Sequence, residues 1–90
     1  MSKVFKALSD ETRREILKML SKQDISAGEI SDNFNMSKPS ISKHLEILRD
    51  AELISSEKKG QFVIYSINMS VLQEVLGNFL NILQNKKGDI

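Results

Sequence analysis

The fold is decided by residues 26–50, which read SAGEISDNFNMSKPSISKHLEILRD. Ser26 with Glu29 three residues later matches a capping box, which predicts that a short helix begins there. After a break at residues 33–36, Ser37 is a suitable N-cap for a second helix. Pro39 is tolerated in its first turn because the missing N–H would have had no partner in the helix. Two short helices joined by such a short turn are the helix-turn-helix layout.

The second of these helices has a single apolar face. Ile41, Leu45 and Leu48 recur at helical spacing, and we expect them to turn inward. Small hydroxyls and lysines then occupy the first turns and the outer side. A helix that enters the major groove by its N-terminus meets base edges with these positions. The residues predicted to contact DNA on this helix are Ser37, Lys38, Pro39, Ser40, Ser42, Lys43 and His44.

Two of these assignments have alternatives. The serines would also be explained by helix capping and contact with solvent alone. His44 lies beside the inward face, so it either packs half-buried against the backbone or turns towards a phosphate. Catalysis or metal binding by His44 would need partner residues that the sequence does not supply.

After residue 52 the period of the apolar pattern changes. Residues 53–67 place β-branched and aromatic side chains on both sides of a turn that contains Gly60, which predicts a β-hairpin. The tip, residues 58–61, is either a solvated turn or a wing that lies along the DNA backbone or in the minor groove. Because the neighbouring helix is basic, we expect the wing residues Lys58, Lys59 and Gln61 to contact DNA.

The charges are sorted along the chain although the net charge is only +1. Residues 24–36 carry three acidic side chains and no basic one, whereas residues 37–45 carry Lys38 and Lys43 and no acid. Together with the lysines of the hairpin tip, the second helix therefore forms the positive surface. A duplex is the expected partner of such a surface, since neutralised phosphates supply most of the affinity.

Amphipathic helices are predicted on both sides of this unit. Residues 9–12 begin one that carries Arg13 and Arg14, and we expect one of these two arginines to pair with Asp10, Asp50 or Glu52 and not with DNA. The last helix, about 69–85, has more apolar side chains than one face can hold.

A thick core would explain this excess, and so would a second copy of the chain. We expect a symmetric dimer through residues 2–8 and 69–85, which would set two recognition helices about one DNA turn apart. The predicted interface residues are Val4, Phe5, Leu8, Leu72, Val75, Leu76, Phe79 and Leu83.

Ninety residues form one domain, predicted to be a winged helix-turn-helix that is mainly α with a β-hairpin wing. The absence of cysteine excludes a disulfide framework, a zinc-thiolate site and a cysteine nucleophile. One histidine and scattered carboxylates predict no enzyme, no cofactor and no metal site. Since there is no apolar run of membrane-spanning length and no secretory signal in residues 1–6, a cytoplasmic protein is expected.

Two stretches resemble the ArsR/SmtB-type repressors. Residues 5–17, FKALSDETRREIL, resemble the opening of that family, and residues 37–54, SKPSISKHLEILRDAELI, resemble its recognition helix and the lead into its wing. The resemblance covers nearly the whole chain. It implies a winged-helix homodimer that represses transcription by occupying operator DNA. By position, its base-reading residues fall on Lys38, Pro39, Ser40, Ser42 and Lys43.

The chain departs from the metal-sensing members of that family. They use Cys-x-Cys near the recognition helix, or His and acidic ligands on the last helix, whereas residues 71–85 offer only Glu74. Residues 59–68, KGQFVIYSIN, and residues 71–73, VLQ, resemble a branch without metal ligands that represses a toxin-immunity operon containing its own gene. That resemblance implies autorepression, relieved by a membrane protein that captures the repressor.

The sequence therefore predicts a sequence-specific DNA-binding repressor without catalytic activity, acting as a homodimer on a palindromic operator. The alternative from another class is a winged-helix interaction module whose basic face binds an acidic protein. Steep salt dependence would accompany both kinds of binding. Preference among duplexes of different sequence separates them.

Overall fold

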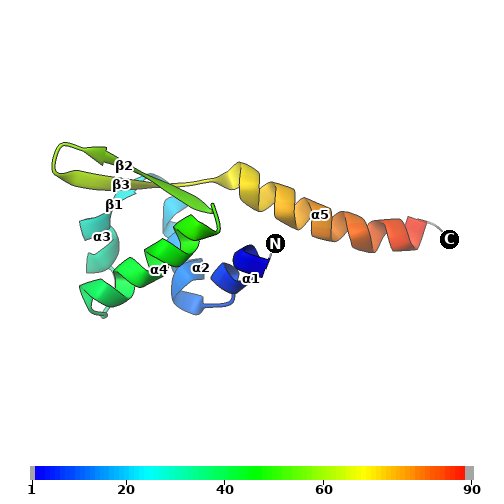
Figure 1. The fold of residues 1–90 in the computed structure, drawn as a ribbon, viewed down its shortest axis with the longest axis horizontal. Helices are drawn as coiled ribbons and strands as arrows, with labels where there is room; N and C mark the ends of the chain where they lie inside the picture. Colours follow the sequence, from blue (N-terminus) through cyan, green and yellow to red (C-terminus); the bar gives the residue numbers. More distant parts are fainter. Residues whose placement is uncertain (1, 89–90) are drawn as a thin grey trace.

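The computed structural model describes residues 2–88, which form five helices and three strands. The helices are α1 (Ser2–Leu8), α2 (Glu11–Leu20), α3 (Ala27–Asp32), α4 (Lys38–Asp50) and α5 (Met69–Gly88). The strands are β1 (Ile25–Ser26), β2 (Ile54–Lys59) and β3 (Phe62–Ile67). Four helices, a hairpin and a last helix follow one another as predicted (Figure 1). The winged helix-turn-helix prediction is thereby confirmed.

Side chains cap three of the helices where the sequence predicted helix starts. The Asp10 carboxylate accepts a hydrogen bond from the backbone N–H of Arg13 at 3.1 Å and so caps α2. Ser26 accepts one from the N–H of Glu29 at 3.2 Å and caps α3. Ser37 caps α4 in the same manner, with Pro39 in the first turn. These bonds satisfy N–H groups that have no partner inside the helix.

The core lies between α1, α2, α3, α4 and the beginning of β2. Its buried side chains are Val4, Ala7, Ile16, Leu17, Leu20, Ile30, Ile41, Leu45, Leu48, Ala51, Leu53 and Ile54. The prediction that Val4 belongs to a dimer interface is wrong, because this side chain is 5% exposed and packs inside the chain's own core. Helical spacing places Val4 on an apolar face but does not tell which partner covers that face.

The sheet has one strand more than the predicted hairpin. β1 pairs antiparallel with β3, Ile25 opposite Tyr65, so that the strand order is β1-β3-β2. β2 extends to Lys59, so Lys58 and Lys59 belong to the strand and the turn proper is Gly60-Gln61. Gly60 has φ +62°, a left-handed conformation that glycine adopts without strain.

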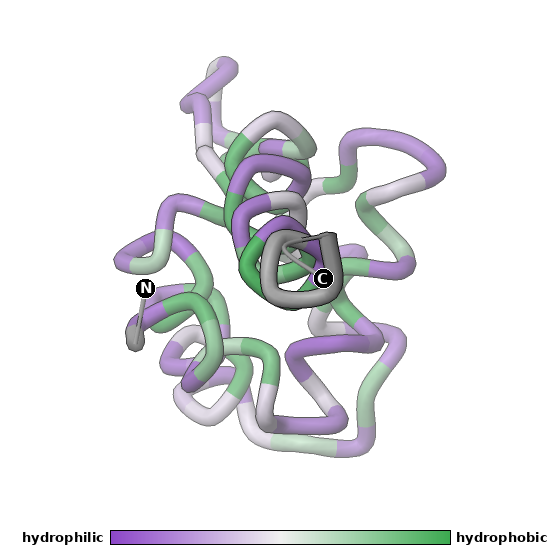
Figure 2. The backbone as a smooth tube through the Cα atoms, turned by 90° about the vertical axis from the view of Figure 1, so that its right-hand side faces the viewer, coloured by the Kyte–Doolittle hydropathy of each residue, from purple (hydrophilic) through white to green (hydrophobic). Residues whose placement is uncertain are grey.

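α5 begins on the core and then projects away from it (Figure 1). Val71, Leu72 and Val75 pack against the core, whereas further along the helix Phe79 and Leu83 are 45% and 54% exposed. The helix continues to Gly88, three residues past its predicted end. Figure 2 views the molecule with α5 pointing towards the reader and shows hydrophobic stretches along this helix as well as in the globular part behind it.

Candidate nucleic-acid interface

α4 is oriented by its apolar face. Ile41, Leu45 and Leu48 are at most 3% exposed, as predicted, and they fix the helix against the core. The residues predicted for DNA contact at its start and on its outer side, except His44, are therefore exposed: Ser37, Lys38, Pro39, Ser40, Ser42 and Lys43. The start of α4 thus presents small polar side chains and two cations on a rigid support.

Ser37 has a structural role at this helix start. Its hydroxyl accepts a hydrogen bond from the N–H of Ser40 at 3.3 Å and donates one to the Ser40 hydroxyl at 2.9 Å. The capping alternative therefore holds for Ser37. Ser42 is exposed further along the helix, beyond these capping contacts, and contact of the serines with DNA stays a prediction.

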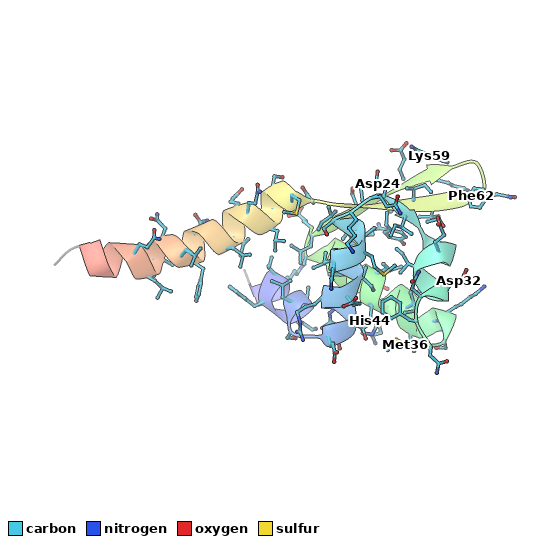
Figure 3. The ribbon with its side chains drawn as sticks, turned by 180° about the vertical axis from the view of Figure 1, so that it is seen from behind. Asp24, Asp32, Met36, His44, Lys59 and Phe62 are labelled. Carbon is cyan, nitrogen blue, oxygen red and sulfur yellow. The ribbon has the colours of Figure 1, made fainter. Side chains whose placement is uncertain are left out.

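The wing tip lies at the same end of the molecule as the start of α4, and α5 projects from the opposite end (Figure 1). Lys58, Lys59 and Gln61 are all exposed. Lys59 pairs with Phe62 across the hairpin and Lys58 with Val63, so the two lysines lie on opposite faces of the ribbon. Figure 3 shows Lys59 and Phe62 at the end of the hairpin remote from α5. The fold therefore brings the two predicted DNA-contacting segments to one end.

The net charge changes sign along α4. Lys38 and Lys43 lie in its first half, whereas the exposed Glu46, Arg49 and Asp50 of its second half sum to a charge of −1. The positive end of the helix dipole adds to the two lysines. Phosphates are accordingly expected near the N-terminal half of α4 and near the wing.

His44 lies on the flank of α4 that faces α2. Its side chain is 17% exposed, and its Nδ1 atom is 3.7 Å from the Asp10 carboxylate and 3.2 Å from Nη1 of Arg13. This is the half-buried packing that was one of the two interpretations of His44, although its partners are side chains and not the backbone. Contact of His44 with DNA stays a prediction.

We predicted that one of the two arginines of α2 pairs with a carboxylate, but both guanidinium groups donate to backbone carbonyls. The Arg13 guanidinium is buried and donates to the carbonyls of Lys6 and Ala7, and Arg14 donates to the carbonyl of Leu8. Both side chains therefore bind the end of α1, because its last carbonyls have no helical N–H partner.

The backbone N–H of Arg13 lowers the pKa of Asp10 by its hydrogen bond, and the charges of His44 and Arg13 act in the same direction. Partial burial of Asp10 opposes them. The Asp10 carboxylate is therefore stabilised in its charged form.

Two residues near or behind this surface were not predicted as functional. Phe62 is 58% exposed beside Lys59, and Arg13 touches the recognition helix from inside. The alternation of side chains along β3 could have indicated that Phe62 is exposed, because it places Phe62 on the face opposite the half-buried Tyr65. Arg13 gave no such signal, since its acceptors are backbone atoms and a residue 31 positions away.

Nowhere in the described part of the chain do three His, Cys, Asp or Glu side chains gather closely enough to hold a metal ion. Within the same residues, no helix combines the length and apolar character needed to cross a membrane.

Comparison with known proteins agrees with this geometry. Residues 10–56 match the model of the family described as bacterial regulatory protein, arsR family. The chain is 51% identical to the transcriptional repressor SdpR of Bacillus subtilis over 90 residues, which cover 100% of both chains. It is 36% identical to the arsenical resistance operon repressor of Staphylococcus aureus, covering 92% of this chain and 79% of that protein.

Solved structures give the same result. The fold is similar to that of an ArsR-like transcriptional regulator from Rhodococcus sp. RHA1, with a TM-score of 0.88 and 33% identity, over 98% of this chain and 83% of that one. The resemblance noted in residues 5–17 and 37–54 thus extends over almost the entire chain.

Proposed function

The chain belongs to the arsR family of bacterial regulatory proteins, and on this premise we propose that it is a DNA-binding transcriptional repressor that acts as a homodimer on a palindromic operator. One observation carries the proposal: the exposed, basic start of α4 and the basic wing tip lie at the same end of the molecule. A duplex at that end would meet the helix in its major groove and the wing on its backbone or minor groove.

Within this interface the residues have different tasks. Ser42 and Lys43 face outward from α4 and read base edges, and Lys43 is suited to the acceptor atoms of guanine. Pro39 offers an apolar contact to a thymine methyl group. Lys58, Lys59 and Gln61 hold the duplex from the wing through contacts that depend little on sequence.

The second copy covers α1 and the exposed part of α5. Phe5 and Phe79 pack edge to face with 5.8 Å between ring centroids, which joins the two helices into one apolar surface. Phe5, Leu76, Phe79 and Leu83 are between 38% and 54% exposed in the single chain. A two-fold symmetric contact buries such a surface on both copies and matches two-fold symmetric DNA.

Release from DNA is proposed to need no metal, since the chain has no cysteine and Glu74 is the one acidic residue in its last helix. The full-length similarity to SdpR supports repression of the protein's own gene. The resemblance to the branch without metal ligands supports capture by a membrane protein as the releasing event, and action in the cytoplasm. The relatives are transcriptional regulators and not enzymes, and we propose that this chain too acts without catalysis or cofactor.

The test is the affinity of the purified protein for fragments of its own promoter, measured against a scrambled duplex of equal length at physiological salt. We expect a preference of roughly a thousandfold for the promoter. Equal, weak binding to both duplexes would contradict the proposal. It would favour instead the interaction module that binds an acidic protein.

A further inference from the structure

We propose that Arg13 fixes the recognition helix α4 relative to the dimer-forming helix α1, and that it thereby sets the half-site spacing that the dimer accepts. The inference rests on the proposed function, because it requires a dimer on a two-part operator. It concerns a residue that lies behind the DNA-contacting surface and acts through the orientation of α4.

The guanidinium of Arg13 bridges two helices. Arg13 is 8% exposed and is the one buried charged residue in the described part of the chain. Its Nε donates to the carbonyl of Ala7 at 2.8 Å and its Nη2 to the carbonyl of Lys6 at 2.9 Å, both in the last turn of α1. Its Nη1 lies 3.2 Å from Nδ1 of His44, in the middle of α4. One rigid, planar group therefore contacts both helices.

The chemistry of this position makes the bridge specific. The last carbonyls of α1 lack the N–H partners of a continuing helix, although that of Lys6 also accepts from the backbone N–H and the hydroxyl of Ser9. A cation complements the negative end of that helix. Burying a guanidinium without hydrogen bonds costs free energy. The side chain of Arg13 is therefore held in the position where it reaches its acceptors. Because Arg13 has only donors, this contact is a hydrogen bond when the His44 ring is neutral and carries its proton on Nε2, so that Nδ1 accepts. Asp10 lies 3.7 Å from the same ring nitrogen and adds a negative charge to the cluster.

A continuous set of contacts leads from the proposed dimer surface to the proposed DNA surface. Phe5 of α1 packs on Phe79 of α5, Arg13 binds the end of α1, and His44 is the neighbour of Lys43 on α4. In a dimer, the angle between α1 and α4 determines how far apart the two recognition helices lie. Half-sites one helical turn apart require about 34 Å between them.

The apolar face of α4 also holds this helix in place. Ile41, Leu45 and Leu48 are buried in the core, so loss of the Arg13 bridge is expected to loosen the orientation of α4 and not to abolish it. The expected effect is therefore on the choice between operators of different spacing. A general loss of binding would be the result if Arg13 only stabilised the fold.

The experiment measures affinity for the protein's own operator at its native half-site spacing and with one base pair added or removed. The wild-type dimer is expected to prefer the native spacing. For Arg13→Met, the preference is expected to fall about tenfold, the size typical of the coupling between groups in direct contact. Sedimentation must show that the variant is still a dimer.

Arg14→Met is the matched control. Arg14 is the neighbouring residue, and its Nη1 also donates to the end of α1, at the carbonyl of Leu8, with a length of 2.8 Å. It differs from Arg13 in being exposed and in lacking a bond to α4 in the structure. Its substitution is expected to leave the preference among spacings unchanged.

His44 provides a second test that does not depend on the folding of an Arg13 variant. In His44→Asn the side-chain oxygen can still accept from Arg13, and the spacing preference is expected to be retained. In His44→Leu no acceptor remains, and the preference is expected to fall as in Arg13→Met. Since the readout is a ratio between spacings, any direct contact of His44 with DNA cancels.

The outcomes separate this inference from the proposed function. If the wild-type protein prefers its native spacing and both Arg13→Met and His44→Leu keep that preference, Arg13 only stabilises the fold and the inference is wrong. The same holds if the two variants lower the affinity for every spacing equally. If the wild-type protein binds its promoter no better than a scrambled duplex, the proposed function fails, and the inference fails with it.

Discussion

Helices α4 and α5 differ in what they leave exposed. α4 buries its apolar residues Ile41, Leu45 and Leu48 to 3% exposure or less, and its outer side carries hydroxyls and lysines. The apolar residues of α5 are partly buried near its start, whereas Phe79 and Leu83 further along are about half exposed. In the single chain, α4 therefore exposes mainly polar side chains to water, whereas α5 leaves apolar side chains in contact with water. A charged duplex suits the first surface, and another apolar surface suits the second.

The largest effect is expected from a charge placed on the exposed surface of α5. Phe79→Asp would put a carboxylate in the apolar contact between two copies, where desolvation opposes association. We expect monomers in sedimentation, and a loss of operator affinity of about a hundredfold or more, because each half-site is then bound singly.

Asn81→Asp is the control for this charge. Asn81 is exposed on the polar side of the same helix, so its substitution is expected to leave the dimer intact. A dimer that persists in Phe79→Asp would remove α5 from the interface. The exposed apolar residues of α5 would then need an explanation other than dimer formation.

The next largest effect is expected at the opposite end. Lys43→Ala removes an outward-facing side chain that is proposed to read bases, and the expected cost on the operator is about 1–3 kcal/mol. The preference for the operator over altered sequences should decrease at the same time. Competition binding with single-base variants of the operator measures both quantities. A loss that is equal for every duplex would show that Lys43 binds phosphate and does not read sequence.

The fold was predictable where its signals are local. Ser26, Asp10 and Ser37 are helix caps, and Gly60 lies in the turn of the wing, because capping and turn formation depend on neighbours a few residues away. β1 was missed because two residues show no alternation. It exists through its pairing with β3, forty positions further along the chain.

The candidate site was predictable for its exposed part only. Spacing placed Lys43 and Ser42 outward and Leu45 inward, and all three positions agree with the structure. The same reasoning could not separate Val4, which packs in the core, from Phe5, which is 38% exposed on the neighbouring position of α1. Tertiary packing decides whether an apolar helix face contacts the chain's own core or a second copy. The apolar pattern in the sequence is the same for both.

A smaller effect is expected at Asp10, which caps α2 and lies 3.7 Å from His44 of α4. Its pKa is lowered below the ordinary value of 3.8 in the folded chain, chiefly by the hydrogen bond from Arg13. A depressed pKa means that the charged carboxylate adds stability above pH 3.8, and that this contribution is lost as the pH falls through the lower folded value.

Urea unfolding between pH 2 and 7 tests whether this contribution to the free energy of unfolding is lost as the pH falls. Asp10→Ala is expected to cost about 1 kcal/mol at pH 7 because α2 loses its N-cap. Asp10→Asn keeps a capping side chain without the charge, so its deficit should be smaller and should disappear at the acid end. A deficit of Asp10→Asn that grows towards low pH would contradict the depressed pKa.

The smallest effects are expected at the wing tip, where two neighbours on one face of the hairpin can be compared. Lys59 and Phe62 are paired across the strands and both are exposed. Lys59→Ala should weaken binding to all duplexes alike and reduce the salt slope by about one unit, since one phosphate contact is lost. Phe62→Ala removes no charge, so any loss of affinity should leave the slope unchanged, with Phe62→Leu intermediate. If neither variant changes affinity or slope, the wing does not touch DNA. The DNA-binding surface would then consist of α4 alone, and the comparison would be between one polar helix, α4, and one apolar helix, α5.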